Sequence, residues 1–146
     1  MVNLAGLAPR AALRAVTAVL EAAGCPDAAY DAGVLYALAA GPGRDPRRDT
    51  APLAADAAAT LAQLAERRAA REPLQYIAGA WDFLDFTLKV GPGVLCPRPD
   101  TEVVCEAAVD LLRGMDVPAL RVLDLCAGTG CLGLGVKRFV PPARVT

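Results

Sequence analysis

The stretch Leu120-Arg-Val-Leu-Asp-Leu-Cys-Ala-Gly-Thr-Gly-Cys-Leu-Gly133 decides the fold class of this chain. It begins with a short apolar run and continues into a turn that contains Gly128 and Gly130. Apolar residues then recur at helical spacing until Pro141-Pro142, and Arg144–Thr146 has the composition of a second strand. Strand, glycine turn and helix in this order open a doubly wound domain. The sequence therefore predicts the α/β class.

The glycine turn predicts a ligand site. Gly128-x-Gly130-x-x-Gly133 has dinucleotide-binding spacing, and the helix N-terminus after it favours an anionic group. That group is a pyrophosphate in a dinucleotide and the methionine carboxylate in S-adenosylmethionine. Asp124, four residues before the first glycine, favours S-adenosylmethionine, because a carboxylate attracts its positive amino and sulfonium groups and repels a pyrophosphate. A nucleotide oxidoreductase and a purely structural turn stay open as alternatives for this motif.

A second motif, Cys96-Pro-Arg-Pro-Asp-Thr-Glu102, lies upstream. Taken alone, it is a rigid Pro-x-Pro loop before a helix whose first turn is acidic, as the helix dipole prefers. Asp100 or Thr101 can cap that helix, which is expected to end near Arg113. By itself the loop is best interpreted as a connector between a strand and a helix. The inner face of the helix is expected to contain Val103, Val104, Ala107, Leu111 and Leu112.

A hairpin is expected before this loop. Apolar and aromatic residues are frequent from Trp81 to Val90 and alternate with polar ones toward the end of that segment. Gly91-Pro-Gly93 predicts a turn, and Val94–Cys96 is the expected return strand.

The first seventy residues predict a small, alanine-rich helical bundle. Pro9 suits a first helical turn and Gly24 ends that helix. Asp27 is the expected cap of a second helix, residues 41–50 form a loop, and Thr50 with Pro52 opens a third helix. The expected inner faces are Leu13, Val16, Val19 and Leu20, then Ala28, Ala32, Leu35 and Leu38, then Leu53, Ala57, Leu61 and Leu64.

In order and spacing, these segments resemble the HemK/PrmC family of release factor glutamine methyltransferases. The resemblance spans most of residues 20–146, and the helical region with Asp31-Ala-Gly-Val-Leu35 is similar to the family's N-terminal bundle. The Pro-Arg-Pro-Asp-Thr-Glu loop is specific to this family and its close relatives. The segments that carry the resemblance are Glu72-Pro-Leu-Gln-Tyr-Ile-Ala-Gly79, Phe83–Val90, Gly91–Glu102 and Val122-Leu-Asp-Leu-Cys-Ala-Gly-Thr-Gly130.

The resemblance implies S-adenosyl-L-methionine as the cofactor of a class I, Rossmann-like methyltransferase domain. Arg98 and Glu102 are implied, more weakly, to wall the active-site side. Cys126-Ala127 stands where Gly-Thr is more frequent in the family, and small side chains preserve such a turn. The residues implied to bind the cofactor are Asp124, Cys126, Ala127, Gly128, Thr129 and Gly130.

The implied reaction is transfer of a methyl group to the side-chain amide nitrogen (N5) of the glutamine in the Gly-Gly-Gln motif of bacterial class I peptide chain release factors. An amide nitrogen is a poor nucleophile because its lone pair is delocalised. The family orients this amide with an Asn-Pro-Pro-Tyr motif, so that positioning replaces strong acid–base catalysis. That tetrapeptide is absent from these 146 residues, and the catalytic residues are therefore not identified.

Three parts are expected: a helical release-factor-binding domain over 1–75, a β-hairpin linker over 76–98, and an incomplete methyltransferase domain over 99–146. Because a parallel sheet normally buries both faces, the 146-residue chain by itself is expected to be inactive, with an unstable C-terminal half. One alternative is a related class I methyltransferase acting on another amide or an exocyclic base nitrogen. The other is a non-catalytic protein that binds release factors.

Composition excludes several other classes. A net charge of −1 gives no basic field for direct nucleic-acid binding. No apolar run approaches the ~20 residues that span a bilayer. Without histidine or a Cys-x-x-Cys pair, a metal site is not expected. Five cysteines without an export signal indicate free thiols in a cytoplasmic protein, with Cys25 and Cys105 as buried small residues.

Overall fold

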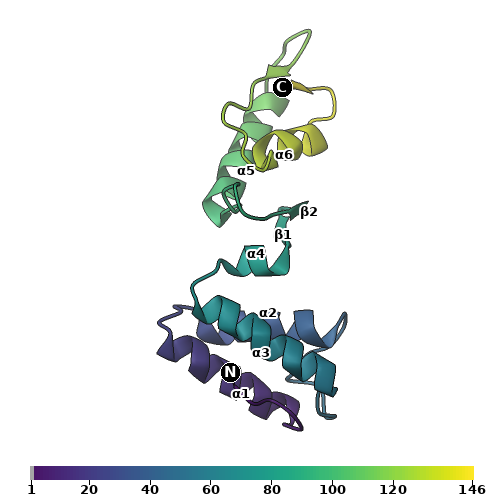
Figure 1. Ribbon diagram of the computed structural model, residues 1–146. Coiled ribbons are helices and arrows are strands. Elements are labelled where there is room, and N and C mark those ends of the chain that lie inside the picture. The colour runs from purple at the N-terminus through teal and green to yellow at the C-terminus, as the bar shows by residue number, and fades with distance from the viewer. Residues whose placement is uncertain (1) are drawn as a thin grey trace. The chain divides into compact units, whose positions relative to one another are not determined.

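The computed structural model describes residues 2–146, which divide into two compact units at Ala78/Gly79. The first unit is helical and the second contains the strands (Figure 1). The first unit contains α1 (Pro9–Ala22), α2 (Ala28–Ala40), α3 (Ala55–Ala69) and α4 (Leu74–Ala78). The second contains β1 (Ala80–Phe83), β2 (Phe86–Lys89), α5 (Pro99–Arg113), β3 (Arg121–Val122), α6 (Cys131–Phe139) and β4 (Arg144–Val145).

The helical unit follows the sequence signals closely. Pro9 is the first residue of α1, and Gly24 takes a positive φ of 74° just after the helix, a conformation that glycine adopts without steric cost. Helices α1, α2 and α3 pack against one another. Their common core contains fully buried Val16, Leu20, Leu35, Tyr36 and Leu61.

Some details of this unit differ from expectation. Leu38 was expected on the inner face of α2 but is 42% exposed. Asp27 stands at the N-cap of α2 without a side-chain capping hydrogen bond. The third helix begins at Ala55 and not at Thr50, and its buried alanines are Ala58, Ala62 and Ala65. Alanine is small enough for either side of such a helix to pack closely, so the stripe alone does not fix the inner face.

A buried ion pair lies inside this helical unit. Asp31 of α2 is 4% exposed, and its Oδ2 accepts a hydrogen bond of 2.7 Å from Nε of Arg68 in α3. The same guanidinium donates to the carbonyl oxygen of Glu72 at 3.0 Å. Arg68 thus joins α2 to the connection between α3 and α4.

The hairpin forms between different segments of the chain from the expected ones. β1 pairs with β2 in antiparallel fashion, with Phe83 opposite Phe86, so the chain turns at Leu84-Asp85. Leu84 has a positive φ of 53°, and its N–H donates to Oε1 of Glu102 at 2.8 Å. The expected return strand at Val94–Cys96 was wrong, since these residues lie outside the strands. A turn without glycine, held by tertiary contacts, leaves no local signal.

Helix α5 also presents a different face from the expected one. Cys105 and Val109 are its buried residues, and Val109 clusters with Val136 of α6. Val103, Val104 and Leu111, expected inside, are 64%, 56% and 66% exposed. Apolar residues occur on two sides of this helix. Their spacing in the sequence does not indicate which side packs against the rest of residues 2–146.

The predicted strand, turn and helix are all present. β3 and β4 pair in parallel through Arg121 with Arg144 and Val122 with Val145, and α6 connects them. The pairing continues with a 2.8 Å hydrogen bond from the N–H of Asp124 to the carbonyl oxygen of Thr146. β3 is shorter than the expected run from Leu120 to Cys126. Within residues 2–146, no helix is both long and apolar enough to cross a bilayer.

Candidate functional site

The glycine turn after β3 is built from left-handed backbone conformations. Cys126, Gly128 and Gly130 have φ values of 62°, 58° and 74°. Gly130 is the N-cap of α6, and its carbonyl oxygen accepts the N–H of Leu134 at 2.8 Å. Because the first N–H groups of a helix have no intrahelical acceptor, this turn directs peptide donors at the space before α6.

Asp124 is tied to this helix N-terminus. Its Oδ2 accepts a 2.9 Å hydrogen bond from the N–H of Gly133 in α6, whereas Oδ1 accepts none from the described residues. A β-carbon on Gly133 would lie 2.9 Å from that Oδ2 and 3.1 Å from a methyl of Val145. Gly133 therefore allows the carboxylate, the helix and β4 to approach closely, and one carboxylate oxygen is left for a ligand.

A cleft of about 490 Å³ lies beside these groups. Three of the sequence-predicted residues line it, namely Asp124, Ala127 and Gly130. The other predicted turn residues, Cys126, Gly128 and Thr129, do not line it. The remaining lining residues are Gly133, Leu134, Lys137, Ala143, Arg144, Val145 and Thr146.

Lys137 is a cleft residue that the sequence interpretation missed. Its Nζ donates to the carbonyl oxygens of Pro141 at 2.7 Å and Ala143 at 3.0 Å, which fixes the connection from α6 to β4. A signal was available, because Lys137 follows Gly133 by four residues and so lies on the same helix face.

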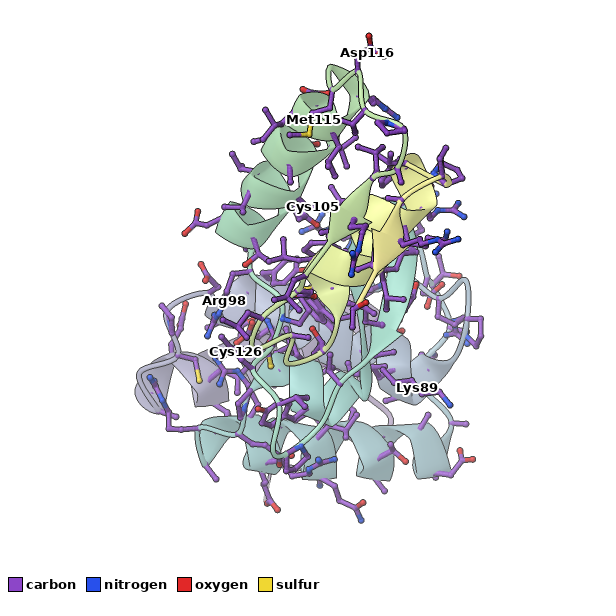
Figure 2. The ribbon with its side chains drawn as sticks, turned by 90° about the horizontal axis from the view of Figure 1, so that it is seen from above. Lys89, Arg98, Cys105, Met115, Asp116 and Cys126 are labelled. Carbon is purple, nitrogen blue, oxygen red and sulfur yellow. The ribbon has the colours of Figure 1, made fainter. Side chains whose placement is uncertain are left out.

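Arg98 and Glu102 lie outside the lining of this cleft. Arg98 is the exposed N-cap residue of α5, and its side chain can be found in Figure 2 with those of Cys105 and Cys126. Glu102 holds the turn of the hairpin through the N–H of Leu84. The structure therefore gives Glu102 a role in fixing the hairpin to α5.

All five cysteines are free thiols, as expected, and four are buried whereas Cys126 is exposed. Burial raises the pKa of the Cys105 thiol, and the neighbouring Cys131, Glu106 and Asp124 raise it further. Cys105 is thus held as an uncharged core residue beneath α6. No cluster of potential metal ligands occurs among residues 2–146.

Replacing Gly133 by alanine is expected to destabilise the second unit by about 1–2 kcal/mol, because the new methyl group displaces the Asp124 carboxylate from its hydrogen bond. Gly33→Ala in α2 is the matched control. Its β-carbon position has no atom within 4 Å, and the helix propensity of alanine predicts up to about 1 kcal/mol of stabilisation. Urea titrations of both variants measure whether each substitution lowers or raises the free energy of unfolding. Equal effects would contradict this role of Gly133.

Known proteins similar to this chain are methyltransferases. Residues 11–79 match the model of the PrmC N-terminal domain. The release factor glutamine methyltransferase of Bifidobacterium longum is 47% identical over 86% of this chain and 45% of its own length. The proteins of that name from Mycolicibacterium smegmatis and Deinococcus radiodurans are 40% and 38% identical, over 93% and 92% of this chain and 47% and 48% of their own lengths.

The chain has a helical unit followed by an α/β unit with a glycine turn. Together with these relatives, this arrangement defines its class as methyltransferase-related proteins. Within it, residues 11–79 match the PrmC N-terminal domain, and most of the chain is similar to release factor glutamine methyltransferases. The chain spans about half the length of the curated relatives that it matches.

Proposed function

We propose that this chain is part of an enzyme that transfers a methyl group from S-adenosylmethionine to the side-chain amide nitrogen of glutamine in the Gly-Gly-Gln motif of class I peptide release factors. The names of the relatives support the reaction and the substrate. The observation that carries the cofactor assignment is the carboxylate of Asp124 at the N-terminus of α6, beside a cleft. In this proposal, residues 99–146 begin the Rossmann-like domain, residues 76–98 link it to the helical unit, and the helical unit contacts the release factor.

The residues of the cleft fit S-adenosylmethionine. Its volume of about 490 Å³ lies within the usual range of small-molecule sites. The free Oδ1 of Asp124 suits a cationic group, and the N-terminus of α6 suits the carboxylate of the methionine part. Leu134 and Val145 supply apolar wall for the adenosine. When bound, the cofactor supplies an activated methyl group on its sulfonium.

The chain's own residues would hold and orient the methyl donor. Asp124 and the turn up to Gly130 fix its position relative to α6, and positioning of reacting groups is a large contribution to catalysis when no strong base is used. An Asn-Pro-Pro-Tyr segment, which we assign to orienting the substrate amide, is not among the 146 residues. The assay must therefore use the gene product as the cell makes it.

The decisive experiment measures release-factor methylation in the source organism. Peptides that contain Gly-Gly-Gln are analysed by mass spectrometry from wild-type cells, from cells lacking the gene, and from cells with Asp124→Asn. The methyl group is expected to disappear without the gene. Asp124→Asn removes the negative charge that faces the cationic group of the cofactor. Calorimetry on the purified variant is expected to show roughly ten- to hundredfold weaker cofactor binding. Asp116→Asn, an exposed carboxylate outside the cleft lining, is the control and is expected to behave as wild type.

The two other candidate functions give different results in the same experiment. A methyltransferase for another amide or a base nitrogen leaves glutamine methylation intact when the gene is removed. A protein that binds release factors without modifying them also leaves methylation intact, but it co-purifies with the factor. Either result would contradict the proposed reaction.

A further inference from the structure

The helical unit has a surface groove that the proposed methyl transfer does not use. It lies between α1, α2 and the loop before α3, and encloses about 400 Å³. Leu13 of α1 and Tyr30, Gly33 and Val34 of α2 form its apolar part. Arg44 and Arg47 of the loop form one rim.

The floor of this groove is open and apolar. Tyr30 is 60% exposed, an unusual state for a large aromatic side chain on a helix. A β-carbon placed on Gly33, one turn further along the helix, would meet no atom within 4 Å. Because Gly33 has no side chain, the space beside the ring of Tyr30 leaves room for one apolar side chain of a partner.

The rim is positively charged. A guanidinium nitrogen of Arg10 donates to the carbonyl oxygen of Arg47 at 2.9 Å, which places both arginines at the same edge. Within residues 2–146, neither Arg10 nor Arg47 forms an ion pair with a carboxylate. Arg44 is neutralised by Asp49 at 2.6 Å. Two unpaired cations at one edge favour an acidic partner.

The loop that carries Arg44 and Arg47 is held in place before any partner binds. Oδ2 of Asp49 accepts hydrogen bonds from Arg44 at 2.6 Å and from the hydroxyl group of buried Tyr36 at 3.0 Å. The hydrogen bond from Arg44 is the main cause that lowers the pKa of Asp49 below its ordinary value. Asp45 accepts the backbone N–H of Arg47 at 2.8 Å. A preformed rim reduces the entropy lost on binding.

We propose that this groove docks an acidic surface segment of the release factor, with one apolar side chain of that segment inserted between Tyr30 and Gly33. The partner's identity rests on the proposed function, whereas the acidic and apolar character of the segment rests on the groove. A protein segment fits better than a nucleic acid, because the floor is apolar and only a few cations lie at its edge, whereas nucleic-acid binding depends on many phosphate contacts.

The test measures binding of the whole chain to a purified class I release factor from the same organism. Tyr30→Ala and Arg47→Glu are each expected to weaken binding at least about tenfold, because the first removes the central aromatic contact and the second turns a cation at the rim into an anion that repels the acidic segment. The matched control is Lys89→Glu, which makes the same charge change at an exposed position of β2. Tyr30 and Arg47 are exposed, and circular dichroism checks that the variants are folded.

The outcomes separate this proposal from the proposed function. Weakening by both groove variants, with Lys89→Glu unchanged and a smaller salt dependence in Arg47→Glu, supports the groove. Unchanged binding in both variants, or no binding of the wild-type chain, overturns the groove and leaves the methylation experiment to decide the activity. Displacement of the release factor by RNA but not by an acidic peptide overturns the assignment to a protein segment.

Discussion

Replacing Arg68 by methionine is expected to lower the free energy of unfolding of the helical unit by about 3–5 kcal/mol. The substitution leaves the carboxylate of Asp31 almost fully buried, since this residue is 4% exposed, and removes its 2.7 Å partner. It also removes the bond that ties α3 to the carbonyl oxygen of Glu72. An uncompensated buried charge costs far more than the net contribution of the intact pair.

Two comparisons isolate the buried charge as the cause. The double variant Asp31→Leu with Arg68→Met replaces both partners by apolar residues and is expected to recover most of the lost stability. Arg67→Met breaks a neighbouring but exposed pair with Glu72 and is expected to change little. Urea unfolding followed by tyrosine fluorescence reports this unit, because all three tyrosines precede Gly79. A double variant as unstable as Arg68→Met would refute the argument.

The boundaries of the first helix were predictable because they depend on local chemistry. Proline fits the first helical turn and glycine adopts positive φ, so Pro9 and Gly24 bracket α1 in the sequence and in the structure. The hairpin was harder to predict. Its turn places Leu84 at positive φ, a conformation enforced by Glu102 and by an ion pair of Asp85 with Arg138. Contacts with residues so distant in sequence have no local pattern.

The buried ion pair shows a second kind of limit. Asp31 is the single charged residue between Ala28 and Ala40, which could have marked it as a buried carboxylate in need of a partner. Arg68 lies 37 residues further along the chain, next to Arg67 in α3 and close to Arg71. Sequence patterns could thus have predicted that a cation is needed, but only the fold selects which one.

The candidate site also has one part that was predictable from the sequence and one part that was not. The turn up to Gly130 was predictable, because glycine spacing after an apolar run is a local signal. The expectation that Asp124 faces a ligand stays a prediction, and the structure adds that one of its oxygens is engaged by Gly133. Lys137 could have been found from the helical spacing after Gly133, but the contribution of Arg144 to the cleft depends on the return of the chain through β4, which no local motif contains.

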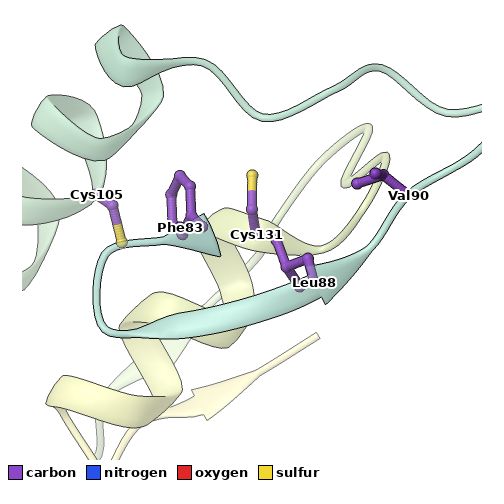
Figure 3. Close-up of a cluster of buried hydrophobic side chains, with 5 residues drawn as sticks. All are labelled: Phe83, Leu88, Val90, Cys105 and Cys131. Atoms are coloured by element: carbon purple, nitrogen blue, oxygen red, sulfur yellow. The ribbon is translucent and has the colours of Figure 1, made fainter. Parts of the chain in front are cut away.

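Replacing Gly135 by alanine is expected to destabilise the second unit by about 1–3 kcal/mol. Gly135 lies on the buried side of α6, where its added β-carbon would be 2.5 Å from Sγ of Cys105 and 3.5 Å from both Phe83 and Leu84. Cys105 and Phe83 are fully buried in the cluster shown in Figure 3, so the sulfur has little room to move away. This overpacking outweighs the helix propensity of alanine, which by itself favours the substitution by about 1 kcal/mol.

The position of the sulfur predicts how this destabilisation can be reversed. Cys105→Ala alone is expected to cost roughly 1 kcal/mol, because it leaves a small cavity. Combined with Gly135→Ala, it removes the clashing atom and gives the new methyl group the vacated space, so the double variant is expected to approach wild-type stability. Fluorescence of Trp81, the single tryptophan, follows this unit during urea unfolding. Additive losses in the double variant would show that the contact between α5 and α6 does not limit residue 135, whereas recovery identifies the Cys105 sulfur as the atom that requires glycine there.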